Sequence, residues 1–184
     1  DLRYLLGIAK IVAADSELRS GKTDEDLRKR AMMLVFADQC IAKRSGLTQD
    51  DVRSERKKVG LQSNLAKIDT LAAEFPAETN YLYSTYHASK SESPKSRRRS
   101  VMVLGSGTYR IGSSVEFDWC CVNAAEAAAE LGYDTLMLNY NPETVSTDYD
   151  VGDKLVFDEV SLESVLDVYE AEKPEGVVVS MGGQ

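Results

Sequence analysis

Histidine is nearly absent from this sequence, and cysteine is scarce. His87 is the only histidine among 184 residues, and the three cysteines are Cys40, Cys120 and Cys121. Their spacing matches no zinc-binding pattern, and a Ser–His or Cys–His nucleophile pair would depend on that one histidine. An odd cysteine count with two adjacent residues is typical of reduced thiols in an intracellular compartment. We therefore expect no metal site and no histidine-based catalysis.

The sequence also lacks a long apolar run. No stretch of 18 or more apolar residues occurs, so we expect no membrane-spanning helix. The first residues contain neither an initiator methionine nor the basic-then-apolar order of a secretory signal peptide. We expect a cytoplasmic protein, with the mitochondrion as the alternative compartment.

Basic residues are few in the second half of the chain. Residues 1–100 contain 19 lysines and arginines against 14 aspartates and glutamates, whereas residues 101–184 contain 3 against 16. The change follows a Ser-, Lys- and Arg-rich stretch at 89–99 that has no apolar residue, which we interpret as a mobile linker between two domains. Its last arginines, followed by Ser100, also fit a basophilic kinase target or a nucleic-acid contact.

The first sixty residues have helical periodicity. Apolar residues recur at spacings of three and four over 2–20, 27–35 and 37–44. A further helix begins after Thr48, where Thr48 and Asp51 resemble a capping box, and ends at Gly60. A Tyr-rich segment at 80–87 predicts extended chain lying on a protein surface. We expect an all-α domain over residues 1–88.

The last two predicted helices of this region also fit a helix-turn-helix. The second of them would present Arg53, Arg56, Lys57 and Lys58, as a DNA-binding helix does. The net charge of −8 argues against affinity for phosphates. A packing module with a solvated basic face is therefore favoured, and no nucleic acid is expected as a partner. A DNA-binding or partner-binding regulatory module stays as the alternative function.

Residues 100–184 alternate strands with helices. Short apolar runs predict buried parallel strands at 100–104, 135–138, 155–157 and 176–180. Strands separated by helices indicate a doubly wound, Rossmann-like parallel sheet with binding surfaces at the carboxyl ends of its strands. Four strands without a closing helix leave one side uncovered, so we expect a truncated α/β domain after the all-α domain.

A glycine-rich loop follows the first of these strands and contains Gly105, Gly107 and Gly112. The dinucleotide fingerprint would require glycine where Arg110 stands and an acidic residue where Asn139 stands. NAD binding is therefore not expected. The glycines would instead allow close backbone approach to an anion or to another segment of the chain.

Several longer motifs resemble carbamoyl phosphate synthetase. The motifs LGSG at 104–107, RIGSSVEFDWC at 110–120, NYNPETVSTDYD at 139–150 and GGQ at 182–184 are similar to the domain that precedes the second ATP-grasp unit. IDTLAAEFPAETNYLY at 68–83 resembles the end of the family's helical oligomerization domain. Both blocks occur in the family's order and spacing, so the resemblance covers essentially the whole chain. The basic linker at 93–99 departs from the family pattern.

The resemblance implies a fragment with three parts. Residues 1–88 would be the C-terminal part of the oligomerization domain, 89–99 a linker, and 100–184 the start of the second pre-ATP-grasp domain. The full enzyme would join bicarbonate, glutamine-derived ammonia and two ATP into carbamoyl phosphate for pyrimidine or arginine synthesis. ATP, Mg²⁺ and K⁺ would bind in ATP-grasp domains outside this chain, so the chain itself would hold no cofactor and no catalytic residue. Its partners would be those domains, a glutaminase domain or subunit, and further copies in a homo-oligomer.

The resemblance also implies an internal tunnel for carbamate. Arg110, Glu116 and Glu143 match charged positions along it, and the small side chain of Ser114 would keep the passage open. Carbamate is an unstable anion, so its passage needs restricted water, a cation to hold it and carboxylates to manage its proton. Without the family, the three charged residues would be interpreted as a structural ion-pair cluster at strand ends.

Overall fold

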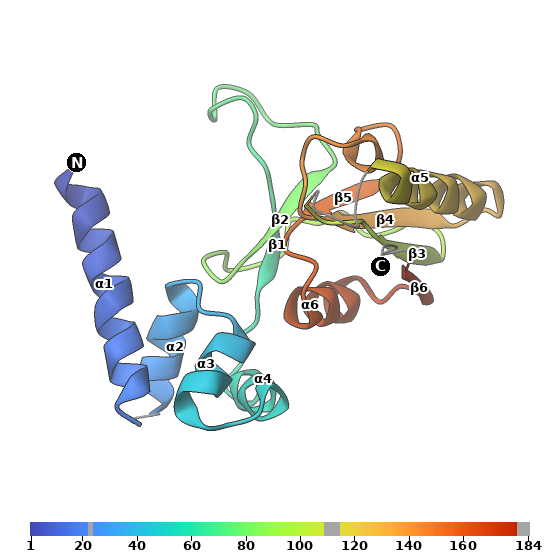
Figure 1. Ribbon diagram of the computed structural model, residues 1–184. Coiled ribbons are helices and arrows are strands. Elements are labelled where there is room, and N and C mark those ends of the chain that lie inside the picture. Colours follow the sequence, from blue (N-terminus) through green and yellow to red (C-terminus); the bar gives the residue numbers. More distant parts are fainter. Residues whose placement is uncertain (22–23, 109–114, 180–184) are drawn as a thin grey trace. The chain divides into compact units, whose positions relative to one another are not determined.

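The computed structural model describes residues 1–21, 24–108 and 115–179, and the chain divides into two compact units, Asp1–Gln62 and Ser63–Gln184 (Figure 1). The first unit contains helices α1 (Leu2–Arg19), α2 (Glu25–Met33), α3 (Asp38–Ser45) and α4 (Gln49–Lys58). The second contains strands β1 (Asn64–Lys67), β2 (Tyr81–Thr85), β3 (Ser100–Leu104), β4 (Asp134–Asn139), β5 (Lys154–Phe157) and β6 (Gly176–Val179). Its helices are α5 (Val115–Glu130), the short 3₁₀ helix η1 (Val145–Thr147) and α6 (Leu162–Glu172).

Helix α4 begins at the expected cap residue, Thr48. The backbone N–H of Asp51 donates to Thr48 Oγ1 at 3.1 Å, and the Asp51 carboxylate accepts from the Thr48 backbone N–H, also at 3.1 Å. This reciprocal pair is the predicted capping box. At the end of α3, Gly46 has a left-handed backbone with φ of 71°, a conformation that favours glycine.

Helix α4 does not present the basic face expected from its sequence. Arg56 is only 3% exposed, and its Nε donates to both carboxylate oxygens of Asp38 on α3 at 3.0 Å. Arg53 is likewise buried, at 8% exposure. Both side chains are covered because α4 packs against α3, where a buried carboxylate matches the guanidinium. The expectation of a solvated basic face is therefore wrong for these two arginines, and the helix-turn-helix alternative loses two of its four cations.

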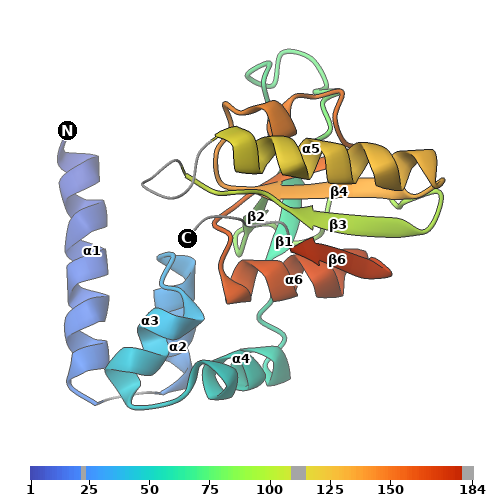
Figure 2. The same cartoon turned by 45° about the vertical axis from the view of Figure 1, so that its right-hand side comes forward.

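A mixed, mainly parallel sheet of six strands forms the second unit. The strand order is β1-β2-β5-β4-β3-β6, and only the β1–β2 pair is antiparallel. Helices α5 and α6 cover opposite faces (Figure 2). Met137 on β4 packs with Val103 toward α5, whereas the neighbouring Leu136 packs with Val156 toward α6. Both faces thus carry a helix, so the expectation of one uncovered side is wrong. Strands β3 to β6 are almost continuously apolar, as predicted for a Rossmann-like sheet.

The sheet has two strands more than the sequence predicted. Strand β2 lies between β1 and β5, with Leu82 opposite Val156 and only 1% exposed. The ring of Tyr81 meets that of Phe157 edge-on, with 5.3 Å between centroids. The predicted extended conformation of the Tyr-rich segment is confirmed, but the segment is an inner strand of the sheet whose Leu82 is buried while Tyr83 stays exposed. The units consequently divide after Gln62, earlier than the predicted boundary at residue 88.

The basic stretch at 89–99 is held by the sheet. The Asp134 carboxylate accepts from the backbone N–H groups of Arg97 and Arg98 at 2.7 and 3.0 Å and from Arg98 Nε at 2.7 Å. Ser100, the candidate kinase target, is the buried first residue of β3. The prediction of a mobile linker is wrong here because Asp134, far along the chain, supplies acceptors for its backbone.

Asp134 makes the stability of this contact depend on pH. Hydrogen bonds, first of all from the backbone N–H of Arg98, hold the pKa of Asp134 below its usual value of 3.8. Since the pKa is lower in the folded state, the stabilisation is complete above the unfolded-state value and is lost as pH falls through the folded-state pKa. We expect Asp134→Asn to destabilise the chain at pH 7, and the difference from wild type to shrink on acidification below about 3.8.

Urea unfolding at several pH values, followed by the fluorescence of Trp119, measures this difference. Trp119 is the only tryptophan and belongs to the second unit. Glu175→Gln is the matched control, because the Arg99–Glu175 pair at the same end of the sheet is exposed and should contribute little. A loss for Asp134→Asn that is as large at pH 3 as at pH 7 would contradict the prediction.

Candidate functional site

Three segments meet at the carboxyl ends of β3 and β4. The glycine loop begins at Gly105, helix α5 begins at Val115, and residues 140–147 follow β4. Leu104 lies opposite Leu138 in the parallel β3–β4 pair. The loops that leave these strands therefore start side by side at the edge where α/β sheets bind ligands.

Gly105 leaves no space for a side chain. A Cβ atom added there would lie 2.3 Å from Asn139 Cγ and 2.6 Å from Asn139 Cβ. Gly107 has a φ of 75°, and its backbone N–H donates to Asn139 Oδ1 at 3.1 Å. Of the two roles expected for the loop glycines, Gly105 serves close approach to another segment of the same chain, whereas Gly107 supplies a left-handed backbone conformation.

A buried aspartate at the start of α5 joins the three segments. Asp118 has no exposed surface. Its Oδ1 accepts from Ser146 Oγ at 2.7 Å and Asn139 Nδ2 at 3.1 Å, and Ser106 Oγ donates to the same oxygen at 3.3 Å. Its Oδ2 accepts from Thr144 Oγ1 at 2.6 Å and from the Ser146 backbone N–H at 2.9 Å. We call these five residues the Asp118 cluster, in which a buried carboxyl group is fully satisfied.

Two of the predicted tunnel residues lie beside this cluster. Glu116 is exposed on the first turn of α5, two residues before Asp118. Glu143 is exposed immediately before Thr144, and its backbone N–H donates to Asn141 Oδ1 at 3.0 Å. The structure thus brings together the segments that carry both carboxylates. The other predicted site residues lie outside the described residues: Arg110, Gly112 and Ser114.

The sequence contained one unused signal for the cluster. Asp118 recurs at helical spacing with Cys121, Val122, Ala125 and Ala128, which form the buried face of α5. An acidic residue on such a face predicts a buried carboxyl group that must find hydrogen-bond donors. The donors themselves could not be named, because they come from as far as 28 residues along the chain.

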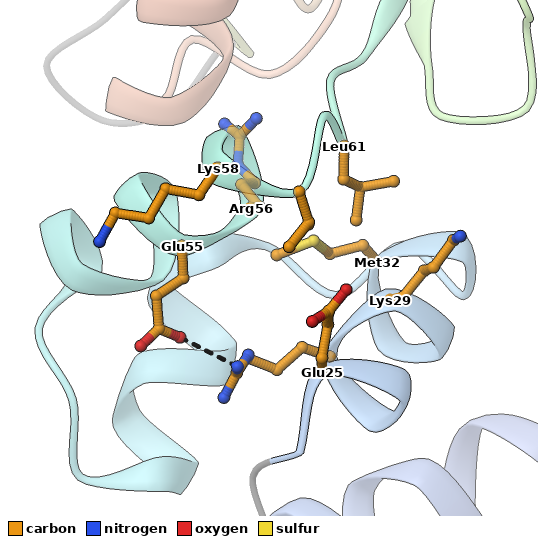
Figure 3. Close-up of a pocket in the computed structure, with 9 residues that line it drawn as sticks. Glu25, Lys29, Met32, Glu55, Arg56, Lys58 and Leu61 are labelled. Carbon is orange, nitrogen blue, oxygen red and sulfur yellow. Dashed lines mark ion pairs between the residues drawn. The ribbon is translucent and has the colours of Figure 1, made fainter.

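A separate pocket lies within the first unit. Its volume is about 290 Å³, and residues of α2, α4 and the chain just after α4 line it, including Met32 (Figure 3). Arg28 on α2 pairs with Glu55 on α4 at 3.2 Å, and the lining residue Arg56 pairs with Asp38. These arginines are thus engaged by carboxylates of the same unit.

Residues 1–21, 24–108 and 115–179 contain neither a metal-binding cluster nor a membrane-spanning helix. Within these ranges, no three His, Cys, Asp or Glu side chains gather closely enough to hold a metal ion. In the same part of the chain, no helix combines the length and apolar character needed to cross a bilayer. The expected absence of a metal site in the whole chain stays a prediction.

Fold and family comparison agree on the class of the second unit. A mixed, mainly parallel sheet with a helix on each face and a glycine loop packed on the neighbouring strand is consistent with the Rossmann-like arrangement of a pre-ATP-grasp domain. Residues 97–184 match the family model described as the carbamoyl phosphate synthase preATP-grasp domain.

Three relatives extend the match to the whole chain. The chain is 50% identical to the mitochondrial arginine-specific large chain of carbamoyl phosphate synthase from Neurospora crassa, and 49% identical to that of Schizosaccharomyces pombe. It is 48% identical to the multifunctional protein ura1 of S. pombe. Each match covers 100% of this chain but only 16%, 16% and 8% of the respective relatives. The chain belongs to the carbamoyl phosphate synthase large-chain family and spans a small part of these relatives, which confirms the predicted family.

Proposed function

We propose that the chain is a piece of a carbamoyl phosphate synthetase, an ATP-dependent ligase. The full enzyme would make carbamoyl phosphate from bicarbonate, glutamine-derived ammonia and two ATP, for pyrimidine or arginine synthesis. The observation that carries this proposal is the identity of about half over the entire chain to the synthase large chains of two fungi. Residues 1–62 would belong to the helical oligomerization domain, and the α/β unit would form the start of the second pre-ATP-grasp domain.

The chain would supply scaffold and no active site. ATP, Mg²⁺ and K⁺ would bind in ATP-grasp domains of the same synthetase, and a glutaminase domain or subunit would supply ammonia. The 184-residue chain alone is accordingly expected to bind no ATP, and micromolar binding in a calorimetric titration would overturn this assignment. We propose the cytoplasm as its compartment, with the mitochondrion as the alternative because two relatives are mitochondrial by name. Cell fractionation distinguishes the two.

We further propose that Glu116 and Glu143 line a passage for carbamate between two phosphorylation sites. Both are exposed at the carboxyl edge of the sheet, on segments joined by the Asp118 cluster. Carboxylates there could accept and return the proton of carbamate while water is restricted. Arg110 and Ser114 are assigned to the same passage by family resemblance alone.

Substitution of these glutamates in the full-length synthetase tests the passage. We expect Glu116→Leu and Glu143→Leu to lower overall carbamoyl phosphate synthesis by about tenfold, because proton handling is lost. Bicarbonate-dependent ATP hydrolysis and ATP formation from carbamoyl phosphate and ADP should stay near wild type, since each active site is intact. Rates of the three reactions are measured side by side.

Glu126→Leu is the matched control for this test, because Glu126 is also exposed on α5 but lies further from its start. It should leave all three rates unchanged. A parallel fall of all three rates in the Glu116 and Glu143 variants would show a structural role, and unchanged synthesis would show that neither residue faces the passage.

The N-terminal helix supports the predicted oligomer or docking role. Of α1, only Ala14 and Leu18 are buried. Seven large apolar side chains of α1 are between 43% and 75% exposed: Leu2, Tyr4, Leu5, Leu6, Ile8, Ile11 and Val12. A helix that is apolar on most of its circumference is usually a buried one. We propose that α1 is covered in the assembled enzyme, by a second copy of the chain or by another domain of the synthetase. Light scattering distinguishes the two, because the molar mass of this chain rises with concentration only if a second copy covers the helix.

A further inference from the structure

The segment that carries Glu143 is anchored immediately after that residue. Thr144 Oγ1 donates to Asp118 Oδ2 at 2.6 Å, and two residues later the Ser146 backbone N–H donates to the same oxygen. Thr147 Oγ1 in turn donates to the Thr144 backbone carbonyl at 3.0 Å. The main chain next to Glu143 is therefore held by one carboxyl group of α5 and by its own short helix.

The same carboxyl group sets the rotation of the first turn of α5. Residues two apart on a helix point to nearly opposite sides, and accordingly Asp118 is buried while Glu116 is exposed. Any rotation that changed the direction of Glu116 would pull Asp118 away from its five donors. One buried side chain thus fixes the positions of both exposed carboxylates.

Packing of the buried face of α5 does not by itself require an acidic residue at position 118. The neighbouring buried residues of α5 are Cys121, Val122 and Ala125, and an apolar residue would complete that face without desolvating a carboxyl group. The acid instead gathers donors from the glycine loop, the end of β4 and the η1 segment. Directional hydrogen bonds specify a geometry that apolar contacts leave free.

We infer that Asp118 is a positioning residue for the reaction, which sets the relative placement of Glu116 and Glu143 along the carbamate passage. This inference rests on the proposed passage. Asp118 touches no reacting atom in this account and acts only through the two glutamates.

Two substitutions in the full-length synthetase weaken the hydrogen bonds between Asp118 and the Thr144–Ser146 segment to different degrees. Asp118→Asn keeps the shape of the side chain but replaces one acceptor oxygen by a donor NH₂. Thr144→Val removes one donor and keeps the volume, so it carries the test if Asp118→Asn does not fold. We expect each to lower overall synthesis by about tenfold. The two glutamates would be displaced, and a small displacement of groups that handle a substrate slows the reaction steeply. Both partial reactions should stay within about twofold of wild type.

A coupled comparison tells positioning from simple stability. In a background that carries Glu116→Gln and Glu143→Gln, adding Asp118→Asn should cause no further loss of synthesis, since the groups it positions are already disabled. A merely structural residue would instead add its loss in both backgrounds. Asp153→Asn is the control, because Asp153 accepts comparable bonds from Thr135 N–H and Oγ1 at the opposite end of β4. It should leave synthesis unchanged.

Amide hydrogen exchange in the same proteins reports directly on the hydrogen bonds that Asp118 accepts from the segment after β4. We expect exchange of the Ser146 amide to be about tenfold faster in Asp118→Asn than in wild type, since one of the two oxygens that accept from five donors is lost, and unchanged in the glutamate variants. Normal synthesis in both Asp118→Asn and Thr144→Val, beside a defective double glutamate variant, would overturn this inference alone. Normal synthesis in the double glutamate variant would overturn the proposed passage itself.

Discussion

Replacing Gly105 with alanine is expected to destabilise the second unit by about 3 kcal/mol or more. The new Cβ would lie 2.3 Å from Asn139 Cγ and 2.6 Å from its Cβ, so the base of a buried side chain must move. Asn139 cannot move freely, because its amide donates to Asp118 and accepts from the Gly107 backbone N–H. Displacing it would leave buried polar groups without partners, which adds to the steric penalty.

Urea unfolding followed by Trp119 fluorescence measures this loss. Gly176→Ala is the matched control in the same sheet, because an added Cβ at Gly176 meets no atom within 4 Å. It should change stability by less than about 1 kcal/mol. Equal stabilities of the two variants would mean that Asn139 can leave its site without losing its hydrogen bonds.

The second large effect is expected in the first unit, where Asp38→Ala should cost about 3 to 5 kcal/mol. The partner Arg56 has a side chain that is 2% exposed and would be left as a buried charge without this carboxylate. The double replacement Asp38→Leu with Arg56→Met should recover stability to within about 1 kcal/mol of wild type, because neither charge is then buried.

Circular dichroism reports the helices of both units, whereas Trp119 fluorescence follows the second unit alone. The stability of the first unit is therefore measured from the part of the circular-dichroism transition that the fluorescence does not share. Glu17→Ala is the control, because the Glu17–Arg30 pair has side chains that are 43% and 58% exposed. An exposed pair should contribute less than about 1 kcal/mol. A loss for Asp38→Ala no larger than that of the control would show that water reaches Arg56 in the variant.

Much of the candidate site was open to prediction from local patterns. Gly105 and Gly107 follow a short apolar strand, and that order alone predicted close backbone approach. Glu116 and Glu143 came from family motifs. The cluster between them was missed because its bonds join Asp118 to donors on two other loops, and no pattern along the chain specifies which loops meet.

Tertiary structure reversed two expectations about charge. Arg53 and Arg56 have the spacing of a solvated basic face, yet a carboxylate on α3 lets Arg56 enter the interior. The arginines at 97–98 have the composition of a linker, yet Asp134 holds their backbone. In both cases the deciding acid is 18 or more residues away, so composition near the arginines could not reveal it.

By itself the sequence determined the capping box of α4, the presence of strands β3 to β6 and the family of this protein, because each depends on residues that are consecutive or nearly so in the chain. Strand β6 is less buried than predicted, since Val179 is 70% exposed. Thr48 and Asp51 form a capping box with groups that lie within one turn. Only the tertiary structure decided that β2 enters the sheet, that Arg53 and Arg56 are buried and that Asp118 joins α5 to the glycine loop and to the segment after β4. Those outcomes depend on partners brought together by packing, and packing free energy is a property of the assembled sheet and helices.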